Sequence, residues 1–387
     1  MNGMTLPVLG YCTNVHPCRS LEDVGRMLAE QAAAVREQCG FEIAVGLWLP
    51  AAATAAGAAQ PAAIEQLRGW LAEHRFSCQT LNAFPFGDFH SERVKEQVYL
   101  PDWSDVRRLD YTRACSRILA GVLAAGADGS LSTLPLGFKQ AEQPAGFLDK
   151  AIAQLLALAQ DLNQLQQETG QTIRLAIEPE PFCLLETTAE TIAFFNRLWQ
   201  AAATAGCEPE ARNHLGVCYD VCHQAVEFED AAAAVGQLDA AGIRINKVQI
   251  SCAVELDQPA DLDARRALAS FAEGRYLHQA FARQADGRLL RTVDLTEQLA
   301  LAPPAEWQTA EKWRVHYHVP VDAERLGPLG TTRAELVRAL DAIGKLAYQP
   351  HLEVETYTWP VLPGVNAGDV TAGIAQELRA TRALLKR

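Results

Sequence analysis

The chain has 387 residues, 49% hydrophobic and 21% charged, and its 34 Lys and Arg against 47 Asp and Glu give a formal net charge of −13. This length predicts one large α/β barrel or two ordinary domains with a large apolar core. Proteins that neutralise many phosphates carry basic surfaces, so the charge argues against nucleic acid as a partner. No run of about 18 apolar residues occurs, so we predict no membrane span.

The ten cysteines indicate a reducing compartment. None forms a Cys-x-x-Cys pair and several lie in apolar, strand-like runs, so we expect small buried thiols rather than disulfides. The N-terminal residues lack the basic and apolar regions of a secretory signal. These features predict a cytoplasmic protein.

Strand-like and helix-like patterns alternate along most of the chain, which is typical of a parallel sheet with crossover helices. Strands are expected at 8–15, 41–49, 78–84, 130–136, 172–178, 215–221, 244–251 and 351–357. Helices are expected at 20–39, 64–74, 103–126, 145–169, 187–205, 231–241, 331–345 and 372–385. The Ala-rich stretch 51–63 is interpreted as a loop and the start of a helix.

The regular alternation breaks between 252 and about 330, where only a segment around 271–283 and a strand-like stretch 314–321 stand out. We therefore predict a single (β/α)8 TIM barrel over residues 1–387, with a long insertion after strand 7. Long inserts in such barrels are commonly lids or substrate loops, so 252–330 is expected to be lid-like. No linker divides the chain into two domains.

Polar side chains follow four consecutive predicted strands: Glu178, Asp220, Gln249, and either Glu353 or Glu355. The C-terminal ends of barrel strands converge, so these groups are expected to meet at one mouth. Buried like charges repel unless a cation compensates, and oxygen ligands suit Mn²⁺, Mg²⁺ or Zn²⁺. The alternative is that the acids pair with arginines or lie at helix N-termini.

Two of these positions require a choice between neighbours. Alternation puts Glu353 and Glu355 on the same side of a strand, and the later residue is nearer the mouth, so Glu355 is the predicted ligand. Glu178 belongs to its apolar run, whereas Glu180 follows the strand-ending Pro179, so Glu178 is preferred.

Several other side chains are candidates for contacting a substrate or a second metal. His223 follows Asp220 by three residues, and His316 and His318 share one face of an extended segment that the insertion would place over the mouth. The alternative for that pair is packing or a hinge. Arg275 and His278 could reach a substrate anion, although a solvated helix face is the alternative.

The segment 216–223, Gly-Val-Cys-Tyr-Asp-Val-Cys-His, resembles the Gly-Val-Cys-x-Asp-Thr-Cys-His of endonuclease IV, and Leu-Ala-Ile-Glu178 and Leu-Glu-Val-Glu355-Thr resemble its flanking strands. With Gly-Tyr-Cys-Thr-Asn-Val-His-Pro at 10–17 and His-Tyr-His-Val-Pro at 316–320, the whole chain is similar to the EboE-type metabolite traffic proteins. That group is a branch of the xylose isomerase-like TIM-barrel superfamily of sugar isomerases, epimerases and endonuclease IV.

The resemblance implies a divalent metal held by Glu178, Asp220 and Glu355, with His223 facing the substrate or a second metal. The seventh-strand position that is usually His is Gln249 here, a neutral oxygen donor that favours Mn²⁺ or Mg²⁺ over tight Zn²⁺.

The histidines that endonuclease IV carries on strands three and four are absent, and Asn82 and Pro135 lie near those positions. A complete trinuclear zinc site and repair of abasic DNA are therefore not expected.

The leading hypothesis is a metal-dependent isomerase or epimerase acting on a small polyol, sugar or cyclitol-type metabolite. Glu178 and Glu355 would transfer the proton through a metal-stabilised enediolate. The alternatives are a non-catalytic metabolite-binding or traffic protein and a metal-dependent phosphoester hydrolase of endonuclease IV type. The expected partner is a small-molecule substrate, and the resemblance adds a homodimer and other proteins of the same gene cluster as further candidates.

Overall fold

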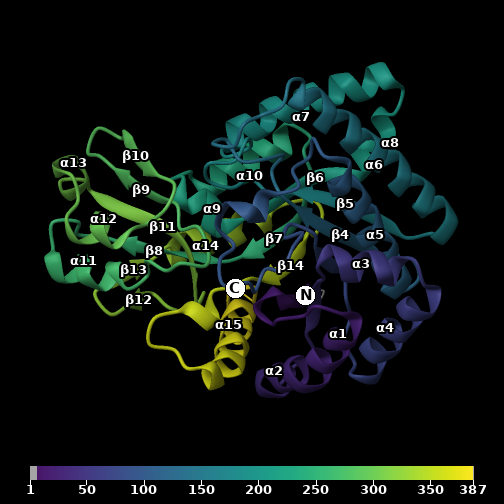
Figure 1. Cartoon of the computed structure of the whole chain (residues 1–387), viewed down its shortest axis with the longest axis horizontal. Helices are drawn as coiled ribbons and strands as arrows, with labels where there is room; N and C mark the ends of the chain where they lie inside the picture. The colour runs from purple at the N-terminus through teal and green to yellow at the C-terminus, as the bar shows by residue number, and fades with distance from the viewer. Residues whose placement is uncertain (1–6, 387) are drawn as a thin grey trace.

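A computed structural model of the chain describes residues 7–386. Within these residues, eight parallel strands close into a barrel in the order β1-β14-β7-β6-β5-β4-β3-β2 (Figure 1). The strands are β1 (Leu9–Cys12), β2 (Ala44–Trp48), β3 (Thr80–Asn82), β4 (Asp128–Thr133), β5 (Thr172–Ile177), β6 (Leu215–Asp220), β7 (Ile245–Ile250) and β14 (His351–Val354). The predicted TIM barrel is confirmed.

An outer ring of helices packs on the barrel and begins and ends largely where the sequence signals indicate. Ser20 forms a capping box with Asp23, and Gly40 adopts a left-handed conformation where the first helical segment ends. Helices on the barrel are α1 (Leu21–Met27), α2 (Ala33–Cys39), α3 (Ala51–Ala58), α4 (Pro61–Glu73), α5 (Val106–Val122), α6 (Phe147–Thr169), α7 (Thr188–Ala205), α8 (Glu208–His214), α9 (Val221–Val226), α10 (Ala231–Ala240), α14 (Arg333–Ile343) and α15 (Val370–Leu384).

One local expectation is corrected, and two short helices are added. The stretch 51–63 is not a loop: it forms α3 and, after a short turn, the start of α4. The short helices α8 and α9 were not predicted, because seven or six residues are too few to display a helical apolar period.

The stretch between β7 and β14 that looked irregular contains a second sheet, drawn in green beside the barrel in Figure 1. Among the described residues it has six antiparallel strands in the order β10-β9-β11-β8-β13-β12. They are β8 (Cys252–Leu256), β9 (Ala280–Arg283), β10 (Leu289–Thr292), β11 (Lys312–Val319), β12 (Arg325–Leu326) and β13 (Leu329–Thr331), accompanied by α11 (Leu262–Ala269), α12 (Glu297–Leu301) and α13 (Ala305–Gln308). Short strands paired across long loops show no βα alternation, which is why the sequence pattern missed them.

The junction of the two sheets determines which side chains meet. Only Ser251 separates β7 from β8, and the end of β11 pairs with the start of β8 through His318 opposite Ala253 and Val319 opposite Cys252. The C-terminal half of β11 is therefore held at the C-terminal end of β7, at the mouth of the barrel.

Two composition-based expectations can be compared with the structure. All ten cysteines are buried and none is disulfide-bonded. In the part of the chain that the structure describes, no helix combines the length and apolarity needed to cross a membrane.

Candidate metal-binding active site

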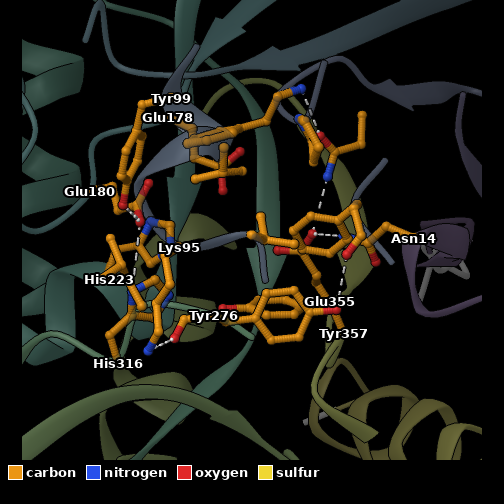
Figure 2. A pocket seen from close by; sticks show the side chains of 17 residues that line it. Asn14, Lys95, Tyr99, Glu178, Glu180, His223, Tyr276, His316, Glu355 and Tyr357 are labelled. Atoms are coloured by element: carbon orange, nitrogen blue, oxygen red, sulfur yellow. Dashed lines mark hydrogen bonds and ion pairs between the residues drawn. The ribbon is translucent and has the colours of Figure 1, made fainter. Parts of the chain in front are cut away.

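Three carboxylates converge at the mouth of the barrel: Glu178 after β5, Asp220 at the end of β6 and Glu355 after β14 (Figure 2 shows Glu178 and Glu355). All three are buried, and one oxygen of each lies within 4.8 Å of the others. Burial, together with the neighbouring charges of Glu355 and Asp220, raises the pKa of Glu178 well above its usual range. Burial and the Asp220 charge raise the pKa of Glu355 to about 8. The cluster therefore repels itself strongly when ionised without a cation.

Asp220 is oriented by the start of the following helix. Its Oδ1 accepts hydrogen bonds from the His223 backbone N–H at 3.1 Å and from Ser251 Oγ at 2.7 Å, so it caps α9. Its Oδ2 is buried and has no hydrogen-bond partner among the described residues. One oxygen thus anchors the side chain while the other is free to bind a ligand.

Glu355 is held by two amides to which the sequence pattern gave no such role. Asn14, just after β1, donates through Nδ2 to Glu355 Oε1 at 2.8 Å, and Asn82 at the end of β3 donates to the same oxygen at 3.1 Å. Asn14 reaches Glu355 from the neighbouring strand β1 and Asn82 from β3, and both amides stabilise the carboxylate and fix its direction.

Gln249 and Glu353 lie next to this cluster on β7 and β14. In the strand register Gln249 is opposite both Asp220 and Glu353. Both amide atoms of Gln249 are buried with no hydrogen-bond partner among residues 7–386. Glu353 is instead paired with Lys247, with 2.6 Å between Oε2 and Nζ, while Glu355 lines the cavity.

His316 and His318 on β11 reach the same mouth with defined ring orientations. The Nδ1–H of His316 donates to Gln279 Oε1 at 2.7 Å, and that of His318 donates to the Glu355 carbonyl oxygen at 2.8 Å. The Nε2 atoms are therefore unprotonated, and neither has a partner in the described structure. His318 Nε2 lies 3.9 Å from Asp220 Oδ2. A ring nitrogen fixed in this way is typical of metal-ligating histidines.

His223 completes a group of three imidazoles. Its Nδ1–H donates to the Pro179 carbonyl oxygen at 2.9 Å, which directs Nε2 to within 3.7 Å of Asp220 Oδ2. The ring centres of His223 and His316 are 4.5 Å apart (Figure 2). Burial, reinforced by the neighbouring imidazoles, lowers the pKa of His316 well below its usual range. This environment therefore favours neutral imidazole at His316.

Glu180, which the sequence analysis passed over in favour of Glu178, also reaches the cavity. Its Oε1 accepts from Tyr99 OH at 2.7 Å and from Gln279 Nε2 at 3.3 Å, and lies 3.7 Å from His316 Nδ1. Burial raises the pKa of Glu180. Glu178 and Glu180 both line the cavity, as alternation along an extended chain predicts for residues two positions apart.

Arg275 and His278, expected to reach a substrate anion, do not line the cavity. His278 lies behind His316: its Nδ1 is 2.9 Å from the His316 carbonyl oxygen and its Nε2 is 2.8 Å from Glu273 Oε1. The Arg275 guanidinium lies over the Tyr276 ring, 5.9 Å from its centre. A direct substrate contact by either residue remains a prediction without geometric support.

The cavity above the carboxylates has a volume of about 60 Å³. No arginine is among the described residues that line it, and its one lysine, Lys95, is already bonded to three oxygen acceptors. Its aromatic walls are Phe84, Phe89, Tyr99, Tyr276 and Tyr357.

The donor set fits a divalent cation. Glu178 Oε2, Asp220 Oδ2 and both amide atoms of Gln249 are buried polar atoms without a hydrogen-bond partner among the described residues. Leaving such atoms unpaired is costly, and a hard cation would satisfy the oxygens and neutralise the carboxylates together. Glu178, Asp220 and Glu355, with the Gln249 oxygen, would hold it.

No protein-family model matches the chain, and no curated protein sequence matches it significantly. Among solved structures, L-ribulose 3-epimerase aligns with a TM-score of 0.50 and 12% identity, over 98% of this chain and 94% of that one. A xylose isomerase-like TIM barrel protein from Mycobacterium smegmatis in complex with magnesium aligns with a TM-score of 0.47 and 12% identity, over 98% of both chains. The IOLI protein with a bound zinc atom aligns with a TM-score of 0.48 and 10% identity, also over 98% of both chains. One of these solved structures is a sugar epimerase, and at this identity the likeness shows the fold alone, a closed eight-stranded TIM barrel.

Proposed function

We propose that this protein is a divalent-metal-dependent isomerase or epimerase of a small polyol, sugar or cyclitol-type metabolite. The observation that carries the proposal is the convergence of Glu178, Asp220 and Glu355 in a buried mouth, one oxygen of each within 4.8 Å of the others, with Glu178 Oε2 and Asp220 Oδ2 lacking a hydrogen-bond partner among the described residues. The donor set, carboxylates and an amide oxygen, favours Mn²⁺ or Mg²⁺ over Zn²⁺. The sugar epimerase among the structural neighbours is consistent with this class.

The proton-transfer step is assigned to Glu178 and Glu355, which come from opposite sides of the barrel. A bound divalent ion would supply electrostatic stabilisation of negative charge on adjacent substrate oxygens. A carboxyl group that can be protonated at the working pH can both accept and return a proton, and in the metal-free protein burial and the Asp220 charge raise the pKa of Glu355 to about 8. Asn14 and Asn82 keep the Glu355 carboxylate directed into the cavity.

The lining of the cavity favours an uncharged substrate. No arginine is among the described residues that line the cavity, and its lysine, Lys95, is already paired with Asp294 at 2.7 Å. A phosphate group would therefore find no unpaired basic side chain in this lining. Aromatic walls suit the C–H faces of a polyol or sugar ring.

Metal content is the first test of the proposal. Protein purified without chelator is analysed by elemental mass spectrometry beside Asp220→Asn, a variant that keeps a good helix cap for α9. About one divalent ion per chain, lost in the variant, is expected. If neither protein binds metal, even after soaking in Mn²⁺ or Zn²⁺, the carboxylates have a structural role and the proposal is refuted.

Catalysis is tested separately. The metal-loaded protein is incubated with a panel of free ketoses and cyclitols in D₂O, and incorporation of deuterium at carbon is measured by NMR. Glu355→Gln should lower exchange by about 100-fold or more while the protein stays folded. Bound ligand without any proton exchange would favour the metabolite-binding or traffic role that the EboE resemblance suggests, with partners among the products of the same gene cluster.

A second candidate function is metal-dependent phosphoester hydrolysis. The observation that favours it is the set of three imidazoles, His223, His316 and His318, each with an Nδ1 held by an oxygen acceptor and, in the two from β11, an Nε2 without a partner. Such nitrogens could hold a second ion next to Asp220, and two-metal sites are typical of phosphoester hydrolases. Two ions per chain and cleavage of a model phosphodiester would support this alternative; one ion per chain favours the isomerase.

A further inference from the structure

We propose that residues 85–99, the segment between β3 and α5, form a gate over the carboxylate cavity and that Lys95 latches this gate to the insertion. The proposal rests on the proposed function only in that a small molecule must enter this cavity. The segment passes between the barrel and the second sheet and contributes Pro85, Phe89, Val94, Lys95 and Tyr99 to the cavity lining.

The size of the cavity requires a part of its wall to move. Its volume of about 60 Å³ has room for roughly five water molecules, at about 10–15 Å³ each. A monosaccharide occupies more space than these waters. The β-strands that supply the carboxylates are fixed by barrel pairing, so we assign the movement to the segment that carries the opposite wall.

The latch is one lysine with three acceptors, all on the insertion. Lys95 Nζ donates to the Tyr276 carbonyl oxygen at 2.6 Å, to Asp294 Oδ2 at 2.7 Å and to the Glu273 carbonyl oxygen at 3.0 Å (Figure 2 shows Lys95 beside Tyr276). The side chain of Lys95 is only 6% exposed, so these charge-assisted bonds are shielded from water. Among the described residues they are the only side-chain ion pair and charge-assisted bonds between segment 85–99 and the insertion, beside neutral bonds such as Tyr276 OH to the Phe89 carbonyl oxygen.

The backbone around Lys95 is bent to make this link. Lys95 has a φ of +39°, a left-handed conformation that costs free energy for a residue with a Cβ. The backbone N–H groups of Val94 and Lys95 both donate to the Arg275 carbonyl oxygen at 2.8 Å. A strained residue that is held by contacts from one neighbouring segment is expected to relax when those contacts break, which favours a two-position element over a static wall.

Aromatic side chains complete the contact between the gate and the insertion. The ring centre of Phe89 lies 4.9 Å from that of Tyr276 and 5.4 Å from that of Tyr357, and Tyr276 and Tyr357 are 5.0 Å apart. Apart from Tyr276 OH to the Phe89 carbonyl oxygen at 3.3 Å, these contacts are apolar. They can slide over a substrate ring without leaving a buried polar atom unpaired.

Tyr99, at the C-terminal end of the gate, contacts polar side chains of the cavity. Tyr99 OH donates to Glu180 Oε1 at 2.7 Å and accepts from Gln279 Nε2 at 3.0 Å, and Gln279 in turn accepts from His316. Opening the gate would remove Tyr99 from this network. The position of the gate is therefore coupled to the environment of Glu180 and to the orientation of His316.

Hydrogen–deuterium exchange on the full-length protein tests the latch. Lys95→Met keeps the length of the side chain but removes the charge, and Asp294→Asn removes the charge from the partner while keeping its shape. Exchange in residues 85–99 and 273–278 should become about tenfold faster in Lys95→Met, and faster in Asp294→Asn, while the barrel strands stay protected. The matched control is Lys312→Met, which removes a lysine paired with Glu255 at 2.8 Å within the second sheet and should leave both segments unchanged.

Access is tested by the rate at which a chelator removes Mn²⁺ from the loaded protein. Lys95→Met should release the metal about tenfold faster than the control variant, with unchanged affinity for Mn²⁺ at equilibrium. Unchanged exchange in both segments would overturn the latch, and faster exchange with unchanged metal release would overturn the gate. Failure of all proteins to bind metal would refute the proposed function instead, and exchange in the two segments would still decide the latch.

Discussion

Lys247 and Glu353 form an ion pair inside the barrel, with 2.6 Å between Nζ and Oε2 and neither side chain exposed. Gly46 on β2 leaves the space that Glu353 occupies, since a Cβ there would lie 1.3 Å from Glu353 Oε1. Burial alone would lower the pKa of Lys247, but Glu353 outweighs burial and raises it. Lys247 is therefore a permanent positive charge beneath the three carboxylates of the mouth.

Removing this charge should destabilise the fold. Lys247→Met leaves Glu353 buried and unpaired, and we expect the free energy of unfolding to fall by about 3–5 kcal/mol, measured by urea denaturation at pH 7. The double variant Lys247→Met with Glu353→Gln should recover much of the loss, because it leaves no buried charge behind. Equal stability of wild type and Lys247→Met would contradict the assigned ion pair.

The metal-free protein should become less stable as pH rises from 5 to 8, relative to Glu355→Gln. The pKa of Glu355 is raised to about 8 in the folded state from 4.5. Between these values the folded state binds more protons than the unfolded state, so the free energy of unfolding falls with increasing pH. Denaturation at pH 5, 6.5 and 8 measures the effect. If the free energy of unfolding depends on pH in the same way in wild type and in the variant, the pKa of Glu355 is not raised in the folded state.

Adding a divalent metal should reverse that loss. At a free Mn²⁺ concentration of about 100 times the dissociation constant, the stabilisation is about 2.7 kcal/mol, which appears as a higher melting temperature. The rise should be larger at pH 8 than at pH 6, because binding releases protons from the carboxyl groups. Glu178→Gln should abolish most of the rise, and Glu210→Gln, on the exterior helix α8, is the matched control.

The three imidazoles should determine whether a second metal ion binds, and the ion held by the carboxylates should not depend on them. His318→Ala leaves Glu178, Asp220 and Glu355 in place, so one ion per chain should remain and any second ion should be lost. Titration with Zn²⁺ followed by elemental analysis counts the ions in wild type and variant. Loss of the only ion in His318→Ala would show instead that the β11 histidines bind the first metal.

Most barrel strands could be predicted because each is an apolar run that precedes an amphipathic helix, as β5 (Thr172–Ile177) followed by α7 (Thr188–Ala205) shows. The second sheet could not, because the pairing of β11 with β8 is set by contacts between residues far apart in sequence. Single strands of that sheet carry no signal of their partners, and only the segment around His316 and His318 was recognised as a strand.

Part of the candidate site could likewise be predicted from the sequence, and part of it could not. Glu178, Asp220 and Glu355 could be brought together from sequence because a barrel aligns its strand ends. The groups that orient them could not, because an amide such as Asn14 is identified as a partner of Glu355 only when two distant strands are placed side by side.

Tyr99 and Gln279 were missed for a related reason. They lie outside the barrel strands, in the β3–α5 segment and the insertion, where no periodic pattern points to a role. A signal was present for Glu180 alone, since it stands beside a predicted ligand and follows a proline.

Because β7 continues almost directly into β8, the barrel and the second sheet build the candidate site together. His316, His318, Tyr276 and Gln279 all belong to the segment between β7 and β14. Excising that segment would leave a barrel with its carboxylates but without two of its three imidazoles and without Tyr276, Leu277 and His316 of the cavity lining. Exchanging the same segment between related barrels would transplant recognition while the carboxylates stay in place. We therefore expect such proteins to acquire new ligands by replacement of this one contiguous segment. Separate changes in each of the eight loops at the barrel mouth would not be needed.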